Sequence, residues 1–396
     1  MRDNFIFTSE SVTAGHPDKL CDQISDAIVD NFLIQDPYSS VEAECIIASG
    51  IMFITVHYAS RASLDIPAIA RHIITEVGYT KDVFDAENST IMTSFMDRTS
   101  THYAPIDLDY LDDEGIERFT SKQQITLFGF ACNQTKQLLP LPIWLAHRIA
   151  DRLDDPKTIK KLPYLLPDSK TQVGIEYKNQ KPDRVHSINL VASQNATSPV
   201  DIEQLREDLI AQVIKPALKG SQCKIDANSL ISVNPEGLLI GGGPDMHSGL
   251  TGRKTSMDTY GGYSRQSGAA LSGKDPLRID RSGAYMARYA AKNVVAAGLA
   301  EECEVQLTYS TGSASPVSVQ VRTFGTSEIS HQEIADRLKD VFDFRPAAIV
   351  RNFNLHKLPA QFQDAGFYRR LAVYGQMGRD DMELPWENTD QAEKLK

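Results

Sequence analysis

The sequence predicts an α/β (α+β) protein, because stretches of strand character alternate with amphipathic helices along its 396 residues. In the first predicted helix, apolar residues recur four apart at Leu20, Ile24 and Ile28. Pairs of apolar, β-branched strands followed by a helix recur in each third of the chain, without a convincing sequence repeat. A chain of this length exceeds one ordinary hydrophobic core, so we expect two or three domains.

The first third begins with a short predicted strand at 5–8 and a helix that starts at Pro17, which leaves His16 near the N-cap. A strand is predicted from 44 to 58 and a helix from 66 to 77. Between 90 and 124 the pattern dissolves into polar and acidic residues, which predicts a long mobile loop or a domain connection.

Further predicted strands lie at 125–132, 172–177, 185–192, 304–309 and 317–322, and further helices at 144–153, 202–210 and about 280–297. We expect Asp280 to cap the last of these helices and Gly298 to follow its end. Ser330 and Glu333 form a capping-box pattern at the start of one more helix. Taken locally, Asp168 and Lys170 favour a solvated turn before the strands.

Composition excludes several classes of protein. The net charge of -11 argues against a nucleic-acid or membrane-surface partner. Five scattered cysteines suggest neither a zinc ribbon nor a disulfide framework, and a reducing cytosol fits them best. No apolar segment has the length of a signal or transmembrane sequence, so we expect neither export nor membrane insertion, and a cytoplasmic protein.

The glycine-rich stretch 241–285 carries the clearest chemistry. Arg253, Lys254, Lys274 and Arg278 are interleaved with glycines that let backbone approach a bulky anion, and Asp280 follows. This pattern is typical of a site for a polyphosphate and a metal. The alternative is a set of surface loops with solvated charges.

A P-loop does not explain the stretch. Gly268 to Lys274 satisfies G-x-x-x-x-G-K, but Asp275 stands where the motif needs Ser or Thr, and Pro276 opposes the helix that should follow. The remaining candidates for phosphate binding are cations outside such a motif, with Lys170 added from another third of the chain. Asp18 and Asp280, at predicted helix starts, are candidate ligands for Mg²⁺.

Long motifs then reveal a family resemblance. They are FTSESVTAGHPDKLCDQISDAIVD, PDSKTQV, GLTGRKTSMDTYGGY, SGKDPLRIDRSGAYMARYAAKNVVAAGLA, FDFRPAAIV and LPWENTD. In this order and over essentially the full length, the chain resembles the methionine adenosyltransferases, that is, the S-adenosylmethionine synthetases. The resemblance implies three similar β/α subdomains, with segments 1–105, 118–236 and 237–396 interleaved in space. It also implies a homodimer with active sites between subunits, with a tetramer as the alternative assembly.

The resemblance implies that a thioether sulfur, of methionine or a related acceptor, attacks C5′ of ATP. The whole triphosphate leaves and is then hydrolysed to pyrophosphate and phosphate. His16 would assist at the departing oxygen and Asp168 would bind the ribose. The implied phosphate ligands are Lys170, Arg253, Lys254 and Lys274. Asp18 and Asp280 would bind Mg²⁺, with two ions per site, and Glu44 would help to hold K⁺.

The sequence departs from the family where the acceptor should bind. His57 and His247 stand where the family has Glu and Asp, and Thr99 and Gln123 stand where it has Gln and Asp. Arg278 replaces a Lys, which keeps the charge but changes its shape.

The expected adenine wall differs too, because Leu238 and Leu239 replace an Arg-Phe pair and Thr311 replaces an Ile. Losing an aromatic stack should weaken or redirect base binding. Besides an ordinary methionine adenosyltransferase, two alternatives therefore stay open. One is the same chemistry with another acceptor or another nucleoside triphosphate, and the other is a non-catalytic, nucleotide-binding regulatory paralogue.

Overall fold

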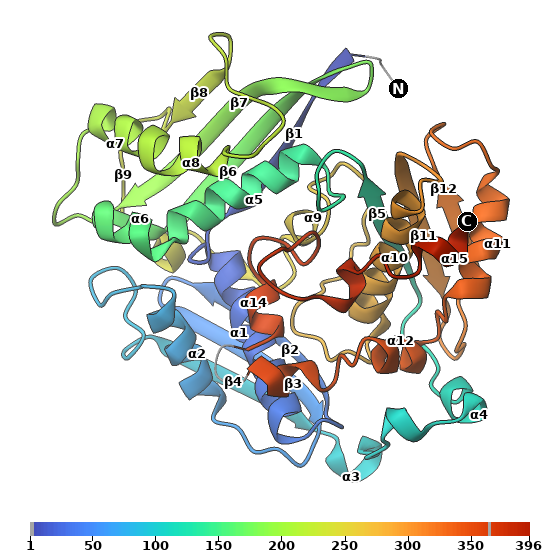
Figure 1. Ribbon diagram of the computed structural model, residues 1–396. Coiled ribbons are helices and arrows are strands. Elements are labelled where there is room, and N and C mark those ends of the chain that lie inside the picture. Colours follow the sequence, from blue (N-terminus) through green and yellow to red (C-terminus); the bar gives the residue numbers. More distant parts are fainter. Residues whose placement is uncertain (1–3, 363–365) are drawn as a thin grey trace.

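The computed structural model describes residues 4–362 and 366–396. Residues 1–3 and 363–365, which belong to the first and third predicted segments, lie outside it. The fold is a mixed α/β structure built from three sheets with helices against them (Figure 1), so the predicted class is confirmed. Among the helices of the described ranges, none is long and apolar enough to cross a membrane.

The described residues form three sheets. The first contains β1 (Asn4–Val12), β6 (Leu165–Lys178), β7 (Lys181–Gln194) and β8 (Leu230–Val233), with β9 (Leu239–Ile240) also paired to β7. The second contains β10 (Gly249–Leu250), β2 (Ser40–Ala48), β3 (Ile51–Ala59) and β4 (Thr90–Asp97). The third contains β12 (Ser318–Arg322), β11 (Glu302–Tyr309) and β5 (Ile125–Cys132). Each sheet thus takes a strand from a distant part of the chain.

One long helix covers each sheet. Helix α5 (Leu141–Asp154) packs on β1 and β6, α1 (Pro17–Gln35) packs on β2 and β10, and α10 (Ile279–Ala296) packs on β5 and β11. Segments α13 (Leu358–Phe362) and α14 (Tyr368–Leu371) return to α1, which lies near the centre of the molecule in Figure 1.

Shorter helices complete the chain. They are α2 (Ile66–Glu76), α3 (Thr99–His102), η1 (Leu108–Tyr110), α4 (Asp113–Glu117), α6 (Pro156–Lys161), α7 (Ile202–Leu209), η2 (Ile210–Ile214), α8 (Lys215–Ala217), η3 (Gly243–Asp245), α9 (Thr255–Asp258), α11 (His331–Val341), α12 (Pro346–Asn352), η5 (Pro385–Glu387) and α15 (Ala392–Leu395).

Two predicted segments of the first third are wrong. The single strand at 44–58 is an antiparallel pair, β2 and β3, that turns at Ser49 and Gly50, whose φ angles of 46° and 76° reverse the chain within two residues. The loop predicted from 90 begins instead with β4, which pairs in parallel with β3. Its exposed apolar residues, such as Met92, obscured the alternation that marks a half-buried strand.

Two predictions at site residues are also wrong. Asp168 and Lys170 lie within β6 rather than in a turn before it, and Asp168 is buried. Asp280 does not cap α10, because Arg278 occupies the N-cap position and Asp280 lies in the first turn. Gly298 does follow the helix with φ of 75°, and the Ser330 hydroxyl accepts the Glu333 amide at 3.1 Å, as predicted.

A row of aspartates along α1 holds distant segments of the chain. Asp18, Asp22, Asp26 and Asp30 are four residues apart, so they lie on one face of the helix, and all are buried. The first three accept the backbone N–H groups of Leu250, Gly252 and Gly273 at 3.0, 2.7 and 2.8 Å. Asp30 accepts those of Tyr368 and Arg369, each at 2.9 Å. One helix face therefore fixes the glycine-rich stretch and the start of α14.

Buried cations balance part of this negative row. Arg281 bonds to Asp26 through its guanidinium, and both side chains are fully buried. Lys19 donates to Asp22 at 2.9 Å and also to Asp258. An uncompensated charge in the interior is costly. Removing one partner of such a pair therefore leaves the other charge buried and destabilises the fold.

Close approach explains two glycines of the stretch. A Cβ on Gly249 would lie 2.1 Å from the Pro17 carbonyl oxygen, next to the first turn of α1. Gly273 has φ of 79°, and a Cβ there would lie 2.0 Å from the Ala43 carbonyl oxygen of β2. Both positions bring backbone against α1 and β2 where a side chain would not fit.

We predict that Asp26→Asn destabilises the protein by about 3–5 kcal/mol, because it leaves the Arg281 guanidinium buried without a charge partner. Chemical denaturation followed by circular dichroism measures the effect. Asp336→Asn, which removes an exposed partner of Lys339 at 2.9 Å, should cost no more than about 0.5 kcal/mol. If Asp26→Asn and Asp336→Asn lowered the free energy of unfolding by equally small amounts, the row of buried aspartates would not be important for stability.

Candidate functional site

His16 is the first side chain of the site and is placed by the start of α1. It occupies the N-cap position, and its Nδ1 accepts the backbone N–H of Asp18 at 3.2 Å, as predicted from Pro17 at the first helical position. Burial lowers the pKa of His16 to about 3, although Asp168 and Asp18 oppose the shift. The imidazole is therefore neutral at physiological pH, with its proton on Nε2 because Nδ1 accepts.

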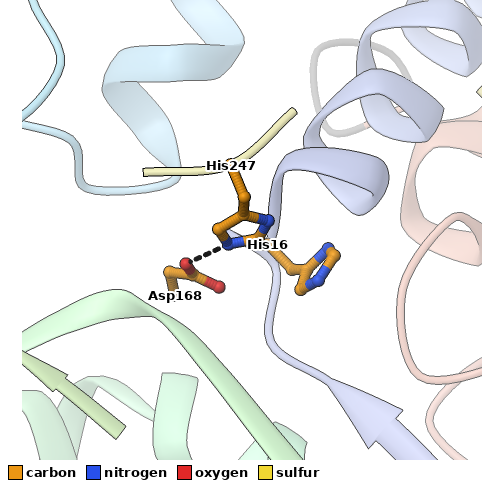
Figure 2. Close-up of side chains that lie close together, drawn as sticks. All are labelled: His16, Asp168 and His247. Carbon is orange, nitrogen blue, oxygen red and sulfur yellow. Dashed lines mark hydrogen bonds and ion pairs between the residues drawn. The ribbon is translucent and has the colours of Figure 1, made fainter. Parts of the chain in front are cut away.

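Asp168 and His247 meet beside His16 (Figure 2). His247 Nε2 lies 2.8 Å from Asp168 Oδ2, and the rings of His16 and His247 are 4.9 Å apart. The same carboxylate oxygen accepts the Gly243 amide at 2.8 Å. Burial alone would raise the pKa of Asp168, but the hydrogen bonds from His247 and Gly243 bring it below its ordinary value. Asp168 is thus a buried carboxylate that stays ionised.

Two cations lie close to Asp18 in the first turn of α1. Lys254 Nζ lies 2.5 Å from Asp18 Oδ2, and Arg253 Nη1 lies 3.8 Å from Oδ1. Lys254 and His16, together with the exposed Lys170 of β6, line a cavity of about 270 Å³. Residues from three parts of the sequence therefore converge on one cavity.

A second group lies where the 271–280 segment meets β2. Lys274 Nζ is 2.8 Å from Asp280 Oδ1, and the backbone of Lys274 pairs with that of Glu42 of β2 in an isolated antiparallel β-bridge. Arg278 pairs with Glu42 at 3.2 Å. Sequence reasoning missed Glu42. The available signal was its position two residues before Glu44, which places both on one face of the strand.

His57 and Glu44 lie on an open face of the second sheet. His57 is opposite Glu42 and Met96 in the strand register, and Glu44 is opposite Thr55. Glu44 is exposed and His57 is half-buried. Both are therefore near the second group, on a sheet face where Ile46, Phe53 and Met92 are exposed.

The other predicted residues lie elsewhere. Thr99 begins α3, and its hydroxyl bonds to the Ser60 carbonyl at 3.0 Å. Gln123 and Thr311 lie next to the ends of the paired strands β5 and β11, and Leu238 and Leu239 lie at the start of β9. Within residues 4–362 and 366–396, no hydrogen bond joins these positions to His16.

The two proposed metal ligands fit a hard cation. Asp280 Oδ2 is buried, and nothing in the described part of the chain donates a hydrogen bond to it. Asp18 is buried too, and its charge is balanced by Lys254. Mg²⁺ usually takes one or two carboxylates together with phosphate oxygens and water. Both acids can hold Mg²⁺ beside a bound polyphosphate.

Chemically, the site combines a neutral histidine, the ionised carboxylate of Asp168, two further buried carboxylates and several cations. The cations can neutralise a polyanion, and the carboxylates can hold metal ions or sugar hydroxyls. The His16 Nε2–H can donate a hydrogen bond without first losing or gaining a proton. This set fits the departure of a polyphosphate better than proton abstraction from a substrate carbon.

Comparison with known proteins extends over the whole chain. Three family models match: the N-terminal domain of S-adenosylmethionine synthetase over residues 4–100, its central domain over 118–239 and its C-terminal domain over 241–388. The S-adenosylmethionine synthase of Trichodesmium erythraeum (strain IMS101) is 42% identical over 410 residues, covering 100% of this chain and 97% of that protein. That of Synechococcus elongatus (strain ATCC 33912 / PCC 7942 / FACHB-805) is 44% identical over 411 residues, covering 100% and 98%.

The family models together span most of the sequence, and relatives of 42% and 44% identity match it nearly end to end. The predicted resemblance is therefore confirmed. The chain belongs to the S-adenosylmethionine synthetase family.

Proposed function

We propose that this chain is a methionine adenosyltransferase. It joins methionine to the adenosyl group of ATP, releases triphosphate and hydrolyses it to pyrophosphate and phosphate, in the cytoplasm. The observation that carries the proposal is the convergence of His16, Lys170 and Lys254 on one cavity, with Asp18 and Asp168 beside it. The family relationship supports the same assignment.

In the proposed reaction, the methionine sulfur forms a bond to C5′ while the bond from C5′ to the triphosphate oxygen breaks. The departing oxygen takes the electron pair. Neutral His16, whose Nδ1 is held by the Asp18 amide, donates its Nε2–H to that oxygen as negative charge develops there. Asp168 accepts hydrogen bonds from the ribose hydroxyls.

The phosphate side depends on cations that already have carboxylate partners. Lys254 is bonded to Asp18 and Lys274 to Asp280, so each ammonium is held in place before the nucleotide arrives. We assign Lys170, Arg253, Lys254 and Lys274 to the phosphates. Asp18 and Asp280 would hold Mg²⁺, which supplies neutralising charge to a leaving group that carries about four negative charges. Glu44 is the proposed K⁺ ligand.

Several of the residues proposed to bind the amino acid or the adenine lie apart from His16 within one chain. His57, Arg278 and His247 are assigned to the amino acid, as are Thr99 and Gln123 on other elements. Leu238, Leu239 and Thr311 are assigned to the adenine. Because Gln123 and Thr311 lie on the third sheet, the proposal places them in the site of a second subunit.

A homodimer with shared sites is supported by the open face of the second sheet. Leu250, Ile46, Phe53 and Met92 are neighbours in the strand register and form one exposed apolar row across four strands. Such rows are typical of protein interfaces. His57 lies on the same face, so the proposed dimer brings it close to a subunit boundary.

The two alternatives receive no support from the comparisons. An altered acceptor rests chiefly on His57, His247 and Gln123, which leave a methionine ammonium without the carboxylates expected there. A non-catalytic paralogue is disfavoured because a nucleotide-binding regulator would not need His16 together with the metal aspartates and phosphate cations.

We predict that the purified protein converts ATP and methionine to S-adenosylmethionine with Mg²⁺ and K⁺ present, releasing pyrophosphate and phosphate in equal amounts. Mass spectrometry and a phosphate assay follow the products. Replacing ATP with GTP, or omitting methionine, provides the matched controls. Consumption of GTP without formation of S-adenosylmethionine would favour an altered substrate, and no turnover of any triphosphate would favour the regulatory paralogue.

Lys274→Ala should lower kcat by about 100-fold or more, because the departing triphosphate loses one of its fixed cations. Steady-state kinetics give the change, and nucleotide binding by calorimetry shows whether the site is still formed. Lys81→Ala is the control, because Lys81 is exposed and lies outside the site. Its Nζ pairs with Glu87 Oε2 at a distance of 2.6 Å. An unchanged kcat in Lys274→Ala would refute its assignment.

A further inference from the structure

The cluster in Figure 2 has the donors of a metal site of a different kind from the proposed Mg²⁺ sites. His16, Asp168 and His247 each offer one donor atom, and these three atoms lie within 4.8 Å of one another. The residues come from the start of α1, from β6 and from the segment after η3. Three separate elements thus bring two imidazoles and one carboxylate together.

This donor set selects a class of ion. Mg²⁺ prefers oxygen ligands, whereas imidazole nitrogen suits Zn²⁺, Co²⁺, Ni²⁺ and Cu²⁺. Two histidines and one carboxylate leave a further position for water or a ligand, as in many zinc sites with three protein ligands. The cluster therefore fits a divalent transition metal rather than Mg²⁺.

Asp168 also offers a buried acceptor atom that no described residue uses. Its side chain is only about 6% exposed, and in the described structure its Oδ1 has no hydrogen-bond partner. A buried carboxylate oxygen is rarely left in this way. A cation bound beside Oδ2 and Oδ1 would satisfy it.

Charges around the cluster also tolerate a cation. Lys254, Arg253 and Lys170 lie nearby, and three carboxylates, of Asp18, Asp168 and Glu10, balance their charges. The ring of His16 is held by the Asp18 amide, which donates to Nδ1 at 3.2 Å. The corner therefore carries no net positive charge against an incoming ion.

We propose that His16, Asp168 and His247 bind a divalent transition metal such as Zn²⁺, and that the bound ion excludes the nucleotide from the site. Binding of the ion does not depend on the proposed function. Exclusion of the nucleotide rests on that function, because it assigns His16 and Asp168 to the nucleotide and the metal would occupy both. A transition metal would act as an inhibitor that competes with ATP.

Titration of the full-length protein with Co²⁺ in excess Mg²⁺, without nucleotide, tests the site directly. We expect visible ligand-field absorption that saturates at one Co²⁺ per chain and is displaced by Zn²⁺. His247→Asn removes one imidazole and should weaken Co²⁺ binding about tenfold or more. His72→Asn, at an exposed histidine of α2, should bind as the unchanged protein does. A featureless spectrum in the unchanged protein would overturn the proposal, and so would equal affinity in His247→Asn.

Zn²⁺ inhibition of S-adenosylmethionine synthesis tests whether the bound ion excludes the nucleotide. We expect inhibition that rising Mg²⁺-ATP relieves and that is weaker in His247→Asn. Inhibition equal in both proteins would contradict exclusion at this cluster. If the protein has no synthetic activity, the proposed function fails, while the Co²⁺ spectrum still decides the metal site.

Discussion

Three of the four buried aspartates on one face of α1 hold the glycine-rich stretch against the helix, and the fourth, Asp30, holds the start of α14. Asp18, Asp22 and Asp26 accept backbone N–H groups from that stretch, turn by turn. Glycine is needed where the backbone comes close, as at Gly273 against β2. The position of Lys254, and of the 271–280 segment with Lys274 and Asp280, therefore depends on a helix that lies more than 200 residues earlier in the sequence.

The same helix also sets the protonation state of His16. At the N-cap, the Asp18 amide occupies Nδ1, and burial keeps the ring neutral. The proposed hydrogen bond to the departing oxygen thus follows from helix geometry rather than from a titrating group. His247 adds a second imidazole at the carboxylate that the ribose is proposed to use, which links the acceptor side of the site to its nucleotide side.

Sequence reasoning identified features that lie within continuous motifs. The N-cap role of His16 follows from the adjacent Pro17, and the amphipathic pattern gave most of α1. It failed where the structure depends on distant pairing. Nothing local connects His247 with Asp168, which is 79 residues away, or Arg278 with Glu42. Strand β4 was missed because its apolar residues are exposed, and Asp280 was misplaced because an acid in a first turn resembles an N-cap in sequence.

Hydrogen exchange of the unliganded protein tests the central role of the aspartate row most directly. Peptides that contain Leu250, Gly252 and Gly273 should exchange slowly, at rates near those of α1, although they lie outside long helices and central strands. The exposed turn at Ala196 and Thr197, whose amides form no hydrogen bond within the described residues, provides the reference for fast exchange. If the amides of Gly252 and Gly273 exchange as fast as that turn, the aspartates do not hold the glycine-rich stretch, and the account is contradicted.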